Sequence, residues 1–80
     1  MKVPFNIKYK REIQQGIFRV ETEYENPVRI LCWDRLGGYP IVGLYEYYED
    51  ECLFEDAECW DEEGNSSGGV DGMNLCIITP

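Results

Sequence analysis

The sequence contains no histidine, and this absence removes several classes of chemistry at once. It excludes catalysis by Ser-His-Asp or Cys-His arrangements, general-base catalysis by imidazole, and histidine ligands to a metal. Basic residues are also scarce, because seven Lys and Arg stand against sixteen Asp and Glu, which gives a net charge of −9. Since binding to phosphates requires basic side chains, direct binding of nucleic acid is not expected.

Long apolar runs are missing as well. No stretch approaches the roughly 20 apolar residues that cross a bilayer, so no membrane-spanning segment is predicted. Residues 1–11 carry charge but lack the apolar core and the small-residue cleavage site of a signal peptide, which predicts a cytoplasmic protein. In that compartment the cysteines are expected to be reduced thiols, whereas a secreted protein could form two disulfides in any of three pairings. The cysteines are Cys32, Cys52, Cys59 and Cys76.

Eighty residues with a hydrophobic content of 44% are typical of one small globular domain, and no repeat or boundary divides the chain. The N-terminal segment, residues 1–16, allows two interpretations. A short helix would end at Gly16, the residue type favoured just after a helix. A strand is the alternative, because Phe5, Ile7 and Tyr9 alternate with polar neighbours.

From Gly16 onward the pattern is that of strands separated by turns. The predicted strands cover residues 17–23, 28–33, 41–48, 52–60 and 73–78. Gly43 lies inside the third strand and indicates a bulge or a close backbone approach. Residues 65–72 are polar and rich in glycine, and are predicted to form a flexible surface loop. The chain is therefore predicted to be one mostly β domain over residues 1–80. It is an antiparallel meander or a partly open barrel of about five strands, with a possible short N-terminal helix.

The charges are distributed unevenly along the chain. Residues 1–35 hold all seven basic residues and five acidic ones, a net +2, whereas residues 36–80 hold eleven acidic residues and no basic one, a net −11. Between Glu49 and Glu63, nine of fifteen positions are acidic. Apolar side chains are interleaved with these carboxylates, so the segment does not resemble a disordered acidic tail.

Two interpretations of this segment stay open, namely a solvated face that keeps the protein soluble and a docking surface for a basic partner. On a strand, Phe54, Asp56, Glu58 and Trp60 would share one face with Cys52. An aromatic side chain ringed by charge is a frequent composition of interface hot spots, and Trp60 is predicted to be such a surface anchor. The candidate interaction residues are Phe54, Glu55, Asp56, Glu58, Trp60 and Asp61. A mimic of DNA would be a special case of docking, but the carboxylates are not spaced regularly enough to support it.

No catalytic, cofactor or metal site is predicted. The nearest cysteines, Cys52 and Cys59, have six residues between them, unlike the close pairs of structural zinc sites. The acidic run 61–65 has its glycine at the fourth place, where a calcium-binding EF-hand loop requires it at the sixth. A domain of this size has little room for the cleft of several hundred Å3 that ligand sites use, so enzymatic activity is not expected.

Four segments in a fixed order carry a resemblance to a known family. They read NPVRILCWDR at 26–35, YPIVGL at 39–44, WDEEGN at 60–65 and NLCI at 74–77. Together they resemble short uncharacterised proteins of gut anaerobic bacteria and their phages or other mobile elements, over about residues 17–78. The resemblance implies a small β-rich domain and no assigned activity, cofactor or catalytic residue. The stretch 49–63 departs from that pattern because it is more acidic.

The leading functional hypothesis is therefore a non-enzymatic interaction module, encoded by a phage or mobile element, that docks a basic host protein through the acidic and aromatic segment. The alternative is a metal- or redox-responsive domain that uses the four cysteines. A third possibility is a homo-oligomer that pairs exposed strand edges.

Overall fold

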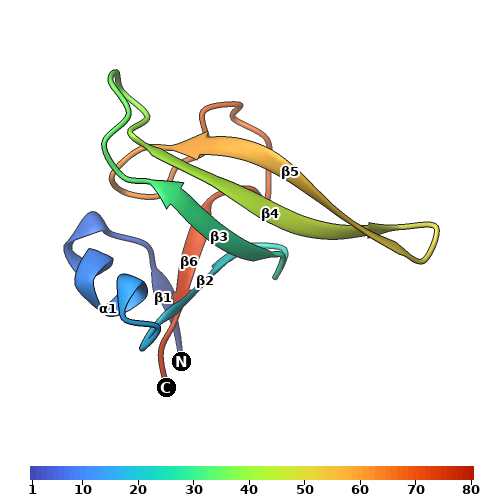
Figure 1. The fold of residues 1–80 in the computed structure, drawn as a ribbon, viewed down its shortest axis with the longest axis horizontal. Coiled ribbons are helices and arrows are strands. Elements are labelled where there is room, and N and C mark those ends of the chain that lie inside the picture. The colour runs from blue at the N-terminus through green and yellow to red at the C-terminus, as the bar shows by residue number, and fades with distance from the viewer.

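The computed structural model describes all 80 residues and contains one open six-stranded antiparallel sheet. The strand order is β1-β6-β2-β3-β4-β5 (Figure 1). The strands are β1 (Lys2–Pro4), β2 (Arg19–Thr22), β3 (Pro27–Cys32), β4 (Ile41–Glu49), β5 (Cys52–Trp60) and β6 (Leu75–Ile78). Strands β2 to β5 form a meander, and β6 returns to pair with β2. The predicted mostly β class is confirmed, and β1 is an additional short strand.

The N-terminal segment contains the predicted short helix, whereas the alternative of a strand through Phe5, Ile7 and Tyr9 is wrong, since β1 ends at Pro4 and residues 7–9 are helical. After β1 the chain forms a 3-10 turn, η1 (Ile7–Tyr9), and a helix, α1 (Lys10–Gln14). Gly16 follows the helix with φ of 77°, a conformation that glycine adopts without strain, and its N–H donates to the carbonyl of Ile13. The predicted helix end at Gly16 is therefore confirmed. Neither helical element is long and apolar enough to span a bilayer.

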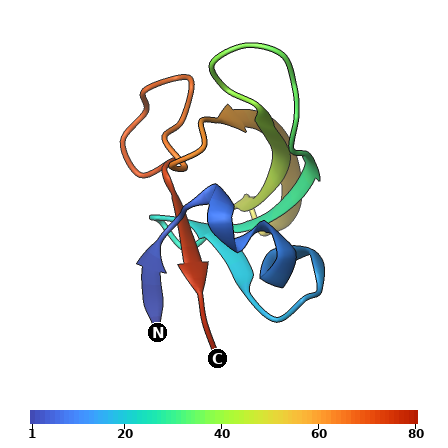
Figure 2. The same ribbon diagram turned by 90° about the vertical axis from the view of Figure 1, so that its left-hand side faces the viewer.

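The hydrophobic core lies inside the curvature of the sheet. Figure 2 shows the strands bending around a common interior, with η1 and α1 beside β1 and β2. Ile77 of β6 is central, because it lies opposite Val3 of β1 on one side and Val20 of β2 on the other. Alternation along each strand places apolar side chains on this inner face. The buried apolar residues are Phe5, Val20, Ile41, Trp60, Leu75 and Ile77.

The turn between β2 and β3 is joined to β4 by side-chain hydrogen bonds. Thr22 is completely buried, and its hydroxyl donates to the side-chain oxygen of Asn26. The side-chain amide of Asn26 in turn donates to the carbonyl of Glu46 in β4 at 2.9 Å. Since a buried hydroxyl without a partner would be costly, this arrangement fixes the turn at one place on the sheet.

The predicted surface loop, residues 65–72, is anchored at its start. Ser66 is buried and forms an isolated antiparallel bridge with Trp60. Its N–H donates to the side-chain oxygen of Asn74, the residue directly before β6. The rest of the loop, 67–71, is exposed as predicted.

Gly43 permits a close contact between β3 and β4. A Cβ atom at this position would lie 2.7 Å from the backbone oxygen of Arg29 and 3.3 Å from the Cα of Ile30. The register between these strands shifts between Ile30 and Cys32, beside this contact. The close backbone approach predicted from the glycine is confirmed.

Replacement of Gly43 by alanine is expected to lower the free energy of unfolding by about 1–3 kcal/mol, because the new methyl group would meet backbone atoms that cannot rotate away. Gly38→Ala is the matched control, since a Cβ there has no neighbour within 4 Å, and its effect should stay below about 1 kcal/mol. Chemical denaturation of both variants measures the difference. Equal stabilities would show that β3 and β4 can separate to admit a side chain.

Candidate functional site

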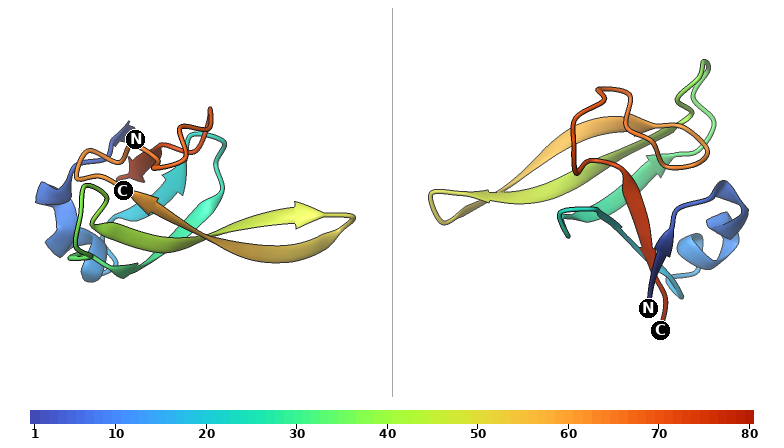
Figure 3. Two further views of the ribbon diagram at one scale, coloured as in Figure 1. Left: turned by 90° about the horizontal axis from the view of Figure 1, so that it is seen from above. Right: turned by 180° about the vertical axis from the view of Figure 1, so that it is seen from behind.

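The hairpin of β4 and β5 projects beyond the rest of the domain (Figure 3). Nine residue pairs join the two strands, from Ile41 opposite Trp60 at the base to Glu49 opposite Cys52 at the tip. Both residues of the base pair are completely buried, whereas Tyr48 and Phe54 near the tip are 74% and 46% exposed. The distal half of the hairpin therefore presents both of its faces away from the core.

One of these faces carries stacked aromatic rings beside a carboxylate. Directly opposed residues of an antiparallel pair share a face, which places Tyr45 with Asp56 and Tyr47 with Phe54. The ring centroids of Tyr47 and Phe54 are 5.8 Å apart at an interplanar angle of 24°, and the ring of Tyr45, two residues before Tyr47 on β4, lies at the same centroid distance from Tyr47. These four residues are called the aromatic–acidic face below.

Both phenols of this face have a pKa above the ordinary value of 10 and are neutral near pH 7. A hydrogen bond with Asp56 raises the pKa of Tyr47, and burial and the charges of Asp56 and Glu49 raise it further. Burial raises the pKa of Tyr45, and the charges of Asp56 and Glu58 add to that effect. Near pH 7 the face thus consists of neutral rings next to the negative charge of Asp56. Such a surface attracts a Lys or Arg side chain through its charge and through its ring faces.

Phe54 and Asp56, two of the six predicted interaction residues, are part of this face. Glu55 lies on the opposite face of the hairpin, where its carboxylate oxygens are 3.1 and 3.2 Å from Nη2 of Arg29. Glu58 shares the face of Asp56, but its carboxylate accepts hydrogen bonds from the hydroxyls of Ser66 and Ser67. Glu58 therefore holds the loop after β5 against the strand.

The prediction that Trp60 is a surface anchor is wrong. Its side chain is completely buried, and its indole N–H donates to the carbonyl of Met73 at 2.7 Å. Trp60 shares a face with Phe54 as the alternation along β5 predicts, but the sheet curves, so the face that is exposed near Phe54 becomes the core at the base of the hairpin. Exposure of a face therefore changes along a single strand.

Asp61 stabilises the turn that follows β5 and lies outside the aromatic–acidic face. Its Oδ1 accepts hydrogen bonds from the backbone N–H groups of Glu63 and Asn65, and its Oδ2 accepts one from the side chain of Asn65. Burial raises the pKa of Asp61, but the hydrogen bonds outweigh burial and the net pKa is lowered. This pattern is that of a structural aspartate in a turn.

The sequence-based reasoning missed Tyr45 and Tyr47 as members of the site. Each lies opposite a predicted residue across the hairpin, so the pairing register identifies them. The predicted strands 41–48 and 52–60 leave three residues between them, whereas the structure has a two-residue turn at 50–51, and a turn of that length fixes the register of both strands.

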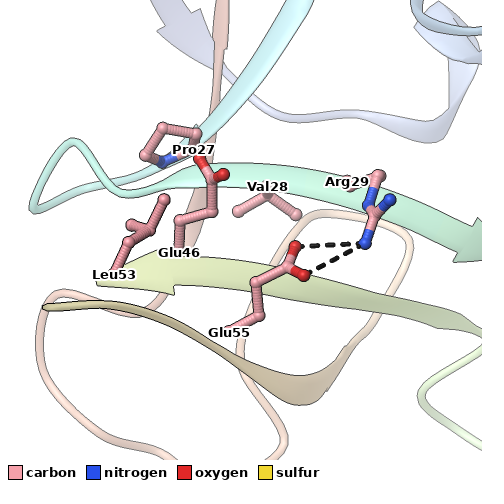
Figure 4. Close-up of a pocket in the computed structure, with 6 residues that line it drawn as sticks. All are labelled: Pro27, Val28, Arg29, Glu46, Leu53 and Glu55. Carbon is pink, nitrogen blue, oxygen red and sulfur yellow. Dashed lines mark hydrogen bonds and ion pairs between the residues drawn. The ribbon is translucent and has the colours of Figure 1, made fainter. Parts of the chain in front are cut away.

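The opposite face of the hairpin forms a shallow groove with β3 (Figure 4). Its volume is about 510 Å3, so the expectation that a domain of this size has little room for a cleft of several hundred Å3 is wrong. The Arg29–Glu55 ion pair crosses it, and Glu46, directly opposite Glu55, adds a second carboxylate. Since the side chains of Arg29 and Glu55 are 65% and 37% exposed, their ion pair contributes little to stability. The groove is lined by Pro27, Val28, Arg29, Glu46, Leu53 and Glu55.

The four cysteines are dispersed over the sheet and all are free thiols. Cys32 and Cys59 lie on opposite sides of Val42, two strand spacings apart. This separation is roughly 10 Å between Cα atoms, beyond the reach of a disulfide. No group of three or more Cys, Asp or Glu side chains is arranged to hold a metal ion. The metal- or redox-responsive alternative stays a prediction without a geometric observation in its favour.

Comparison of the chain with protein-family models, with curated protein sequences and with solved structures found no match. The resemblance to proteins of gut anaerobes and their phages therefore stays a prediction, and the functional argument rests on the geometry of the hairpin.

Replacement of Asp61 by Asn is expected to lower the free energy of unfolding by about 1 kcal/mol at pH 7, because the amide loses charge-assisted hydrogen bonds. The folded-state pKa is below the ordinary value of 3.8. The carboxylate therefore makes its full contribution to the free energy of unfolding above pH 3.8, and this contribution is lost as the pH falls through the folded-state pKa. The difference from the wild type should shrink below about pH 4, as measured by denaturation across pH.

Glu62→Gln is the matched control for this experiment, since Glu62 is exposed and neighbours the same turn. It should leave the acid branch of the stability curve unchanged. A deficit of the Asp61 variant that stayed constant between neutral and acid pH would contradict the assigned role.

Replacement of Glu51 by Gly is expected to stabilise the hairpin by about 0.5–1 kcal/mol. Asp50 and Glu51 have φ of 50° and 66°, the conformation of a two-residue type I′ turn, which favours glycine at its second position. Glu49→Gly removes the same side chain from extended backbone, and should destabilise the protein by a similar amount. Chemical denaturation distinguishes them, and destabilisation by both changes would disprove the turn geometry.

Proposed function

We propose that the protein is a non-enzymatic interaction module that docks a basic partner protein through the aromatic–acidic face. The observation that carries this proposal is the exposed ring of Phe54, stacked on the half-buried ring of Tyr47 beside Asp56 on a projecting hairpin. A solvated face needs only charge, whereas a partly exposed pair of stacked rings adds apolar area and a surface that attracts cations.

The contacts available to a partner are specific. A Lys or Arg side chain laid over the ring of Phe54 or Tyr47 gains about 0.5–1 kcal/mol at an exposed site, and more where water is excluded. Its charged group can reach the carboxylate of Asp56, which adds a charge-assisted hydrogen bond. Tyrosine, which this face supplies twice, is among the residues enriched in interface hot spots.

The charge distribution of the whole chain supports the same partner. Residues 36–80 carry a net charge of −11 without a single basic residue, and they include the entire hairpin. Such a field speeds the encounter with a positively charged surface and repels acidic proteins. Because exposed charges are screened, the association should weaken as salt is added.

The test is affinity capture from a lysate of the organism that encodes the protein, followed by purification of the captured protein. The double variant Phe54→Ser with Asp56→Asn is expected to bind this partner at least about tenfold more weakly than the wild type, since it removes both the ring and the charge. Titration at two salt concentrations measures the dissociation constants.

The matched control is Leu36→Ser with Glu62→Gln, which removes one exposed apolar side chain and one exposed carboxylate elsewhere; Leu36 is 94% exposed. This control should retain the wild-type affinity within about twofold. If both double variants lose the same affinity, net charge alone explains the binding. If both retain the wild-type affinity, the aromatic–acidic face does not take part in the interaction.

A further inference from the structure

Strand β5 is the last strand of the sheet, and the direction of its backbone groups can be deduced. The N–H of Ser67 donates to the carbonyl of Cys59 at 2.9 Å, from the side of β5 opposite β4. The carbonyl of Cys59 therefore points away from the sheet. In an edge strand, the backbone N–H and carbonyl groups of successive residues point alternately toward the neighbouring strand and away from it. The backbone groups of every second residue before Cys59 therefore also point away from β4.

Leu53, Glu55 and Ala57 consequently direct their N–H and carbonyl groups to the outer side. None of the backbone hydrogen bonds in turns and loops involves these three residues. The two-residue turn gives the same assignment, because it makes Glu49 and Cys52 a hydrogen-bonded pair. Cys52 therefore bonds toward β4, and Leu53 points outward. The edge thus presents three donors and three acceptors in a row.

The base of the same edge is closed. The carboxylate of Glu58 accepts the N–H of Cys59 at 2.8 Å, and the loop after β5 covers the next positions through the bridge between Ser66 and Trp60. The unpaired stretch is therefore confined to the distal, projecting part of the hairpin, from Leu53 to Ala57. The opposite edge of the sheet, β1, has only three residues, and one of them is Pro4, which lacks an N–H.

We propose that the outer edge of β5 binds an extended basic segment of the partner as an added strand. This inference rests on the proposed docking function and specifies the partner as a chain that pairs through its backbone. The main chain would bond to Leu53, Glu55 and Ala57, and alternate side chains would lie beside Phe54 and Asp56 on the aromatic–acidic face.

Charge selects this occupant over a second copy of the chain. Between Glu49 and Glu58 the hairpin carries Glu49, Asp50, Glu51, Glu55, Asp56 and Glu58 and no basic residue. Pairing of two β5 edges would bring these carboxylates together, and like charges across a strand pair are destabilising. A strand with Lys at alternate positions meets complementary charge in the same geometry.

The experiment uses the full chain labelled with 15N and a seven-residue peptide, Thr-Lys-Val-Lys-Val-Lys-Thr, blocked at both ends. At saturation, hydrogen exchange of the amides of Leu53, Glu55 and Ala57 is expected to slow at least about tenfold, because each amide gains a bonding partner. The amides of Phe54 and Asp56, which already face β4, should change less. The same peptide with N-methylated central residues keeps its charge and loses its donors, and should not protect these amides.

The variant Ala57→Pro tests the edge from the side of the protein. It removes an outward N–H, which an edge strand tolerates, and it leaves every side chain of the aromatic–acidic face in place. It should bind the peptide at least about tenfold more weakly than the wild type. The amide spectrum of the variant shows whether it folds. If it does not fold, the N-methylated peptide tests the same backbone pairing on the wild-type chain.

The outcomes separate this inference from the docking proposal. If both peptides bind equally and the three outer amides stay unprotected, strand addition is wrong and docking by side chains stands. If neither peptide binds at low salt, strand addition is overturned and the capture experiment decides the docking proposal alone. Protection of the outer amides without peptide, increasing with protein concentration, would assign the edge to a second copy and overturn the basic partner.

Discussion

The burial of Trp60 is the constraint on which the placement of the hairpin depends. Its ring closes the core at the end of β5, and its indole N–H is bonded to Met73 before β6 begins. Side chains along a strand alternate with a period of two, so one buried position determines the face of every other. A slip of one residue would bury Cys59 in place of Trp60 and move Phe54 and Asp56 to the opposite face. The core and the aromatic–acidic face therefore share a single register.

The acidic residues of β5 and of the turn after it form two groups, one that stabilises the fold and one that is exposed near the tip. At the base, Glu58 is occupied by the hydroxyls of Ser66 and Ser67, and Asp61 by its own turn. Toward the tip, only the exposed pair of Glu55 with Arg29 uses a carboxylate in an ion pair. The remaining negative charge of the tip is balanced by no basic side chain of the chain itself. It is compensated by solvent and salt, or by the positive charge of a partner.

The sequence predicted those features of the fold that depend on neighbours along the chain. The pattern of strand residues and turns identified β2 to β6, and the glycine in β4 indicated the close contact with β3. Features that depend on contacts between distant residues were missed. Strand β1 exists because it pairs with β6 at the other end of the chain, and the role of Glu58 depends on where the loop at 65–72 returns. The depth of Trp60 depends on the curvature of the whole sheet, which no local pattern encodes.

Acidic residues on an edge strand serve two purposes that charge alone cannot distinguish. They oppose the pairing of two copies of the chain through β5, and their charge complements the basic strand proposed above. The position of the aromatic residues distinguishes these purposes. Carboxylates alone would suffice to keep the edge solvated, whereas Phe54 and Tyr47 place a stacked, partly exposed surface directly beside the unpaired backbone. Exposed rings favour association and the charges oppose self-pairing, so both features support the proposed partner of opposite charge.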